Sequence, residues 1–259
     1  MDLGLKGRTA IVCASSRGLG KACALSLARE GVRVVINGRD EKVLAATRDE
    51  IAKATGSAVT AVAADVGTHE GQDALLAACP EPDILVNNNG GPPIKDFREL
   101  DRAAMLAGVI QNMVTPIELI QRAVPAMQRR KFGRIVNITS ISVKMPLLGL
   151  DLSSGARAGL TAFMAGPARD LAQHNITVNN LLPGMFDTDR LRNSTGRMAK
   201  MQGKSEAEMA AQRQATVPMR RFGEAGEIGE ICAFLCSVQA GYITGQSILV
   251  DGGLFNTVG

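Results

Sequence analysis

The chain has 259 residues and a formal net charge of +4, and its content of hydrophobic (46%) and charged (21%) residues is that of a globular protein. Two histidines and five scattered cysteines exclude the familiar zinc sites, and an aromatic content of 3% excludes a base-stacking platform for nucleic acid. The N-terminus does not resemble a signal peptide, and the cysteines form no CxxC pair. We therefore expect a cytoplasmic protein without a metal, nucleic-acid or membrane partner.

The tyrosine count limits the chemistry that the chain can perform. The sequence contains one tyrosine, Tyr242, and no tryptophan. Any mechanism that requires a tyrosine side chain therefore has a single candidate.

Short β-branched runs alternate with longer segments of helical periodicity along the whole chain. In chain order, strands are predicted at residues 8–14, 32–37, 58–64, 83–87, 134–139, 176–182 and 247–250, and helices at 18–30, 41–55, 71–78, 101–130, 153–174 and 224–237. Almost continuously apolar strands separated by helices predict a parallel sheet that is covered on both faces. We expect one α/β domain over residues 1–259, a doubly wound sheet that binds its ligand at the carboxyl ends of the strands.

One segment interrupts this alternation. Residues 185–221 are polar and contain five methionines. Because methionine adapts to varied apolar shapes, the segment is predicted to be a mobile lid over a substrate pocket. The alternative is a peripheral helical excursion with ordinary methionine contacts in the core.

A glycine-containing turn follows the first predicted strand and leads into a helix. Its residues are Ser15, Ser16, Arg17, Gly18, Leu19 and Gly20. At such a turn, backbone amides approach a pyrophosphate at the positive end of the helix. The turn therefore predicts a dinucleotide-binding site.

The end of the second predicted strand indicates which dinucleotide is bound. A carboxylate there would hold the ribose 2′-hydroxyl of NAD, but this strand ends in Asn37, Gly38 and Arg39. Arg39 and Arg17 can instead pair with a 2′-phosphate, whose geometry suits the guanidinium group. The pattern favours NADP(H) over NAD(H); the alternative is that both arginines are ordinary surface charges.

Further motifs, in order and well spaced, resemble the short-chain dehydrogenase/reductase family over essentially the whole chain. The turn is similar to the family's TGxxxGxG motif, with Cys13 and Ala14 in place of the Thr and the first Gly. The resemblance implies a Rossmann-type sheet of strand order 3-2-1-4-5-6-7, and it places Tyr242 in a structural C-terminal segment. It also implies roles for Asp65 and Val66 at the adenine, Asn88 and Gly90 in an NNAG-like motif, Asn112 and Ser140 in catalysis, and Pro183, Gly184 and Thr188 near the nicotinamide.

The chain departs from the family where the YxxxK motif is expected. Thirteen residues after Ser140 stands Ser153, and four residues later stands Arg157. The sequence is thus similar to a divergent branch related to β-ketoacyl-carrier-protein reductases. In the family, the tyrosine transfers a proton and the lysine binds the nicotinamide ribose and lowers the tyrosine pKa. A serine hydroxyl is far less acidic than a phenol, and arginine remains charged.

Three hypotheses for the function remain open from the sequence. The leading one is an NADP(H)-dependent oxidoreductase that interconverts a small carbonyl and an alcohol, such as a 3-oxoacyl compound, with Ser142, Lys144 or Asp151 as substitute proton donors. The second is a non-catalytic NADP(H)-binding sensor or scaffold. The third binds no dinucleotide because Ala14 crowds the pyrophosphate. The resemblance also implies a homo-oligomer, a dimer or tetramer, that pairs through helices 101–130 and 153–174.

Overall fold

A computed structural model describes residues 1–92 and 94–257, and its centre is a parallel sheet of seven strands. The strand order is 3-2-1-4-5-6-7, as the sequence predicts. The strands are β1 (Thr9–Val12), β2 (Arg33–Gly38), β3 (Val59–Ala63), β4 (Ile84–Asn87), β5 (Gly133–Ile138), β6 (Ile176–Pro183) and β7 (Ser247–Val250).

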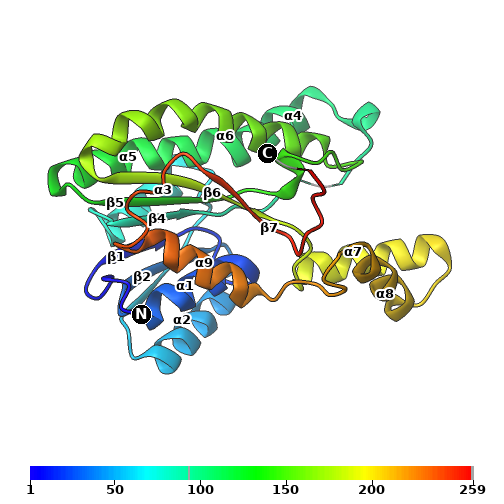
Figure 1. Cartoon of the computed structure of the whole chain (residues 1–259), viewed down its shortest axis with the longest axis horizontal. Coiled ribbons are helices and arrows are strands. Elements are labelled where there is room, and N and C mark those ends of the chain that lie inside the picture. Colours follow the sequence, from blue (N-terminus) through cyan, green and yellow to red (C-terminus); the bar gives the residue numbers. More distant parts are fainter. Residues whose placement is uncertain (93, 258–259) are drawn as a thin grey trace.

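Helices cover both faces of this sheet (Figure 1). The helices α1 (Gly18–Arg29), α2 (Glu41–Thr55) and α9 (Ala225–Cys236) lie on one face, and α3 (His69–Ala78), α5 (Thr115–Arg130) and α6 (Asp151–Leu171) lie on the other. Alternate residues of one strand face opposite sides, so Val12 packs with the α1 and α9 residues and Ile11 with the α3, α5 and α6 residues. The fold is therefore the predicted doubly wound α/β sheet.

The helix predicted over residues 101–130 is continuous but irregular. It consists of α4 (Arg102–Val109), a π-helical turn (Ile110–Val114) and α5. By length and composition, Arg102–Arg130 is the one helix in the described part of the chain that could cross a membrane. Here its α5 portion packs on the sheet through the buried Leu119 and Met127, as the core helices of globular proteins do.

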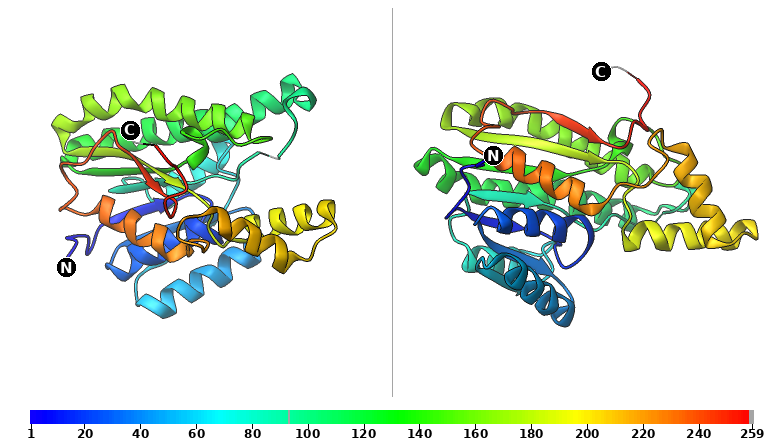
Figure 2. Two further views of the ribbon diagram at one scale, coloured as in Figure 1. Left: turned by 45° about the vertical axis from the view of Figure 1, so that its right-hand side comes forward. Right: turned by 60° about the horizontal axis from the view of Figure 1, so that its bottom comes forward.

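The segment 185–221 is largely helical. It contains α7 (Asp189–Gln202) and α8 (Glu206–Thr216), neither of which was predicted as a helix. Both views of Figure 2 show the pair projecting beyond the sheet. The side chain of Thr188 caps α7, Ser205 and Glu208 form a capping box on α8, and Arg213 donates to Thr195 Oγ1 between the two helices. The helical excursion is thus present, and its action as a lid remains a prediction.

A row of buried amides joins the strands on one side of the sheet. Asn87 on β4 donates to Asn137 on β5 at 2.9 Å, Asn137 donates to Asn180 on β6 at 3.0 Å, and Asn180 donates to Ser247 on β7 at 3.3 Å. Because buried polar groups are costly when unpaired, the row specifies the register of these strands. It also holds the end of β4 where the candidate site begins.

Candidate active site

The turn between β1 and α1 is open to a ligand at the carboxyl edge of the sheet. Helix α1 has no side-chain cap and no acidic residue in its first turn, whereas Asp40 caps α2 and Thr68 caps α3. Its first backbone amides, at the positive end of the helix, are therefore available to an anion. This arrangement fits a pyrophosphate group.

Close backbone packing shapes this turn. A Cβ atom at Gly20 would lie 2.5 Å from the Ala14 carbonyl oxygen and 2.7 Å from Nδ2 of Asn88. The Asn88 side chain donates to that same carbonyl at 3.0 Å. Ala14 adopts a left-handed conformation (φ 43°), which glycine adopts more easily, and its N–H donates to Asn37 Oδ1. Ala14 is thus held within the turn by two neighbouring strands.

Two predicted cofactor residues of this turn have side chains that serve the fold. Ser15 is fully buried; its hydroxyl donates to Val12 O at 2.6 Å and accepts from the Asn37 N–H at 2.9 Å. Leu19 packs against the core under α1. Only their backbone groups are available to a ligand. Ser16 and Arg17, by contrast, line an open groove beside α1.

The residues predicted for the adenosine end follow β2 and β3. The Arg39 guanidinium and the Asp65 carboxylate are 3.9 Å apart, and both side chains are largely exposed. Asp65 also accepts from the Gly67 N–H, while Val66 is buried and lines the inner pocket. A positive charge therefore stands at the end of β2, where a 2′-phosphate would be recognised.

The loop after β6 returns over the glycine turn. Pro183 ends β6, and a Cβ atom at Gly184 would lie 2.8 Å from the Asp251 Cα atom. Thr188 then lies close to the turn: a Cβ atom added at Gly18 would be 3.6 Å from the Thr188 Cγ2 atom. The predicted residues of β1 and β6 are therefore neighbours across one groove.

Asn112 lies in the π-helical turn between α4 and α5, and its side chain is 2% exposed. Its Nδ2 makes a long, 3.4 Å bond to Gly108 O, and its Oδ1 has no partner in the described chain. Asn89 on the loop after β4 donates to Gln111 O at 2.8 Å and so joins this loop to the π turn. π-helical turns occur often at functional sites.

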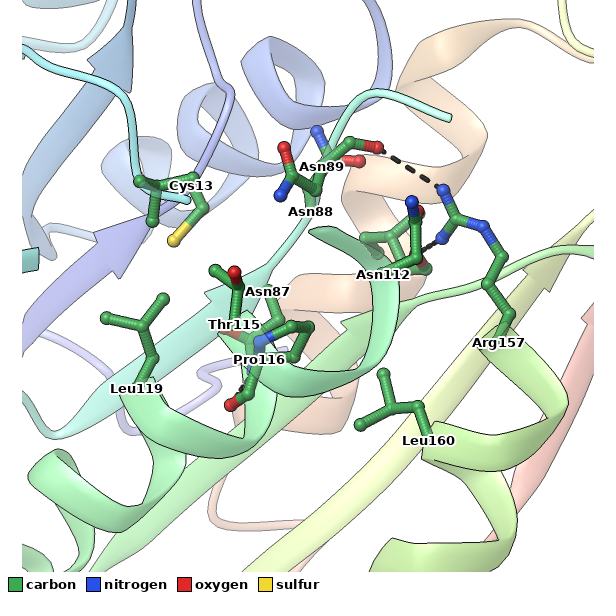
Figure 3. A pocket seen from close by; sticks show the side chains of 12 residues that line it. Cys13, Asn87, Asn88, Asn89, Asn112, Thr115, Pro116, Leu119, Arg157 and Leu160 are labelled. Atoms are coloured by element: carbon green, nitrogen blue, oxygen red, sulfur yellow. Dashed lines mark hydrogen bonds between the residues drawn. The ribbon is translucent and has the colours of Figure 1, made fainter. Parts of the chain in front are cut away.

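A small cavity of about 10 Å³ adjoins Asn112 (Figure 3). Three of its lining atoms have no hydrogen-bond partner in the described chain, namely Asn87 Oδ1, Asn112 Oδ1 and Thr115 Oγ1. The cavity is of the size that holds one water molecule, and these atoms supply the polar partners that a buried water requires. Cys13 also lines the cavity, and burial raises its pKa to about 12, so it is a neutral thiol.

Arg157 on α6 also lines this cavity, and Ser153 lies four residues earlier on the same helix. Arg157 Nε donates to Ser153 Oγ at 3.3 Å, Nη1 donates to Ile138 O at 2.7 Å, and Nη2 donates to Asn89 O at 3.3 Å. Both side chains are buried (5% and 8% exposed). Figure 3 shows Arg157 reaching toward Asn89 and Asn112. Ser140 follows β5 two residues after Ile138, is only partly buried, and accepts from the Ser142 N–H.

Burial, and secondarily the charge of Arg190, lowers the pKa of Arg157 to about 10. This value is still far above neutral, so Arg157 is a cation at physiological pH. The Arg157 guanidinium can therefore donate hydrogen bonds and stabilise negative charge, but it cannot relay a proton. Arg157 thus bonds to the loop that follows β4, and Asn112 lies in the π turn that is bonded to the same loop. Ser153 is joined to this loop through Arg157, and Ser140 follows the strand end that Arg157 binds.

Sequence reasoning missed Arg190 on the first turn of α7. Its Nη2 donates to Pro92 O at 3.4 Å, and its guanidinium lies against Gly91. Arg190 follows the predicted site residue Thr188 by two positions, and this proximity in sequence could have marked it as a candidate. The sequence does not show, however, that its side chain points toward Gly91 and Pro92. The loop after β4 is thus contacted by arginines from two helices.

Comparisons with known proteins agree with this architecture. Residues 13–255 match the family model described as enoyl-(acyl carrier protein) reductase. The NADPH-dependent reductase BacG of Bacillus subtilis is 34% identical over 97% of this chain and 99% of its own length. The 3-oxoacyl-[acyl-carrier-protein] reductase FabG of Aquifex aeolicus is 30% identical over 98% of this chain and 100% of its own.

Solved structures show the same likeness. The NADPH-dependent reductase YwfH superposes with a TM-score of 0.91 at 33% identity, covering 97% of this chain and 99% of its own. L-sorbose reductase from Gluconobacter frateurii, solved with NADPH and L-sorbose, gives a TM-score of 0.94 at 29% identity over the whole of both chains. The chain belongs to the short-chain dehydrogenase/reductase family, whose members are NAD(P)(H)-dependent oxidoreductases of carbonyl and alcohol substrates.

Substitution Gly20→Ala tests whether the β1–α1 turn is the cofactor cradle. We expect the added methyl group to displace the Ala14 carbonyl, to lower the free energy of unfolding by about 1–3 kcal/mol, and to weaken NADPH binding about tenfold. Calorimetric titration and thermal melting measure both effects. Gly155→Ala is the control, because it lies exposed on α6 with open space around its Cβ. NADPH binding of wild-type strength in Gly20→Ala would exclude this cradle.

Proposed function

We propose that the chain is an NADP(H)-dependent oxidoreductase that interconverts a small carbonyl and an alcohol, of 3-oxoacyl or related type, without a catalytic tyrosine. We infer that Ser153 and Arg157 stand where the family has its Tyr and Lys. The observation that carries the proposal is that Arg157 and the π turn of Asn112 are both bonded to Asn89, on the loop whose Asn88 contacts the α1 turn. Ser140 follows two residues after Ile138, whose carbonyl Arg157 also binds. The similarity to BacG and FabG, which are named as reductases, supports it.

When bound, NADPH supplies the hydride. The amides of the α1 turn and the exposed Arg17 and Arg39 would hold its phosphates. Asp65 and Val66 would contact the adenine, Asn88 and Gly90 would lie along the cofactor, and Pro183, Gly184 and Thr188 would lie near the nicotinamide. NADP(H) is favoured over NAD(H) because β2 ends in Gly38 and Arg39 and offers no carboxylate at that position.

The chain's own residues position the carbonyl and its oxygen. The partly exposed Ser140 hydroxyl can donate a hydrogen bond to the carbonyl oxygen, and it would stabilise the negative charge that develops there. Ser153 is buried, and an aliphatic hydroxyl is a far weaker acid than a phenol, so we infer that it does not serve as the acid. The proton then comes from another group, and a water molecule in the water-sized cavity beside Asn112 is the source we propose.

The buried position of Ser153 also favours the alternative function, an NADP(H)-binding sensor or scaffold without turnover. The two proposals share cofactor binding and differ in chemistry. They are therefore separated by a measurement of turnover together with binding.

Turnover should be measured as NADPH oxidation at 340 nm with a panel of 3-oxoacyl, quinone and aldehyde substrates. We expect turnover with at least one substrate, and loss of about 10²–10³ in kcat for Ser140→Ala because the donor to the carbonyl oxygen is removed. Ser154→Ala is the matched control, because the Ser154 hydroxyl bonds only to Leu150 O within α6. NADPH binding with no oxidation across the panel would support the sensor instead.

Substitution Arg39→Ala tests the cofactor preference. Loss of a charge-assisted contact to the 2′-phosphate is expected to weaken NADPH binding by roughly 10- to 100-fold and to leave NADH binding unchanged. Lys53→Ala, an exposed position at the end of α2, should leave both affinities at wild-type values. Equal losses for the two cofactors in Arg39→Ala would contradict a role in 2′-phosphate recognition.

We also propose that the protein is a homo-oligomer that pairs through the α4–α5 and α6 helices. Met105, Leu106, Ile110 and Phe163 expose apolar side chains on these helices, which is unfavourable in a monomer. Light scattering should give a dimer or tetramer, and Phe163→Glu should shift it toward a monomer. A wild-type monomer at micromolar concentration would contradict the proposal.

We further propose a lid role for residues 185–221 and, because all five cysteines are free and buried, a cytoplasmic location.

A further inference from the structure

Two arginines from different helices are bound to the same short loop after β4. Arg157 of α6 donates to the carbonyl of Asn89 at 3.3 Å, and Arg190 of α7 donates to the carbonyl of Pro92 at 3.4 Å. Arg157 also donates to Ile138 O, two residues before Ser140 on the same chain segment. Both guanidinium groups therefore lie at the β4 loop, and Arg157 also reaches the strand end that precedes Ser140.

Arg190 is in direct contact with the backbone of this loop. A Cβ atom at Gly91 would lie 2.2 Å from Arg190 Nη1, so the absence of a side chain at Gly91 makes the contact possible. Two residues earlier, Thr188 approaches Gly18 of the α1 turn. The first turn of α7 thus spans the groove, with Thr188 at the phosphate-binding side and Arg190 at the side of the β4 loop.

Neither cation has an acidic partner. Within residues 1–92 and 94–257, no carboxylate lies within 4.0 Å of Arg157 or Arg190. Burial lowers the pKa of both arginines, and the second cause is a like charge, that of Arg190 on Arg157 and that of Arg197 on Arg190. Buried charges are ordinarily paired, so a cluster of this kind is completed by an anion.

The two side chains retain donors for such an anion. Of the five N–H donors of Arg157, three are bonded within the described chain, and two are uncommitted. Arg190 makes one long hydrogen bond. A carboxylate matches the planar fork of a guanidinium and can be shared between two of them.

We propose that Arg190, together with Arg157, binds the carboxylate of an oxo acid, so that the physiological substrate carries a free carboxylate as well as the carbonyl that is reduced. This assignment rests on the proposed function and specifies its substrate class. Arg190 is then a specificity-determining residue, and the buried Arg157 helps to orient the same substrate carboxylate.

The position of Arg190 argues against a partner among the cofactor phosphates. The uncapped amides that suit the pyrophosphate are at the start of α1, beside Thr188, and the proposed 2′-phosphate residues follow β1 and β2. Arg190 instead contacts Gly91 and Pro92, beyond β4. Its guanidinium is therefore bound at the β4 loop, which Arg157 also contacts.

The test uses matched pairs of oxo acids and their methyl esters: pyruvate, acetoacetate and levulinate against the corresponding esters. Binding to the protein loaded with NADP⁺, where no reduction occurs, is measured from the rise in melting temperature with ligand concentration. Turnover with NADPH is measured separately for the same compounds. The variants are Arg190→Met, Arg190→Lys as the charge-conserving rescue, and Lys200→Met as an exposed control on the same helix.

We expect at least one acid to bind about tenfold or more tightly than its ester. Arg190→Met should abolish this difference, Arg190→Lys should retain part of it, and Lys200→Met should retain all of it, with NADP⁺ affinity unchanged in each. Acid binding that depends on Arg190 without any turnover would support the inference and reject the proposed reductase activity.

Three results would overturn the inference. The first is equal binding of every acid and its ester to the wild-type protein. The second is an acid preference that survives in Arg190→Met. The third is a loss of NADP⁺ affinity in Arg190→Met with an unchanged ratio of acid to ester, which would assign Arg190 to the cofactor.

Discussion

The candidate site is organised by one buried cation, the guanidinium of Arg157. It joins three elements that are distant in sequence, because it bonds to Ser153 on its own helix, to Ile138 O at the end of β5 and to Asn89 O after β4. Asn89 in turn bonds to Gln111 O and so connects this group to the π turn that carries Asn112. Desolvation makes such a cation costly unless its donors are used, and here the Ser153 hydroxyl and two backbone carbonyls accept from three of the five.

This arrangement changes the chemistry expected of the fold. A lysine beside a tyrosine tunes a phenol to act as an acid, whereas Arg157 remains charged and is bonded to a serine whose hydroxyl is a poor acid. The pocket has a positively charged side chain, Arg157, and a water-sized cavity beside Asn112. We propose that the Ser140 hydroxyl donates to the carbonyl oxygen. Hydride transfer to an oriented, polarised carbonyl is compatible with these groups, and proton delivery is the step for which the protein needs a different route.

The parallel sheet and most helix limits could be predicted because apolar strands and amphipathic helices alternate with a clear period. The strand order was implied by the resemblance of the ordered motifs to the family. Motif spacing, through the resemblance to the family, predicted roles for Asn112, Ser140, Ser153 and Arg157. These roles remain predictions; in the structure Arg157 is bonded to Ser153 and to the loop after β4. Side-chain direction could not be read in this way. The Ser15 side chain is buried against β2, and Arg190 lies over Gly91. Neither could be predicted, because both depend on contacts between segments that are far apart in the chain. The helices α7 and α8 were missed because their polar sequence resembles a loop.

The most direct test of the central claim, hydride transfer without a tyrosine, follows the hydride itself. The wild-type protein is supplied with NADPH that carries deuterium at the transferred position on C4 and with a carbonyl substrate, and the product is analysed by mass spectrometry and NMR. The account predicts one deuterium on the former carbonyl carbon of each product molecule, formed at the same rate as NADP⁺. Tight NADPH binding with no labelled alcohol from any carbonyl would contradict it.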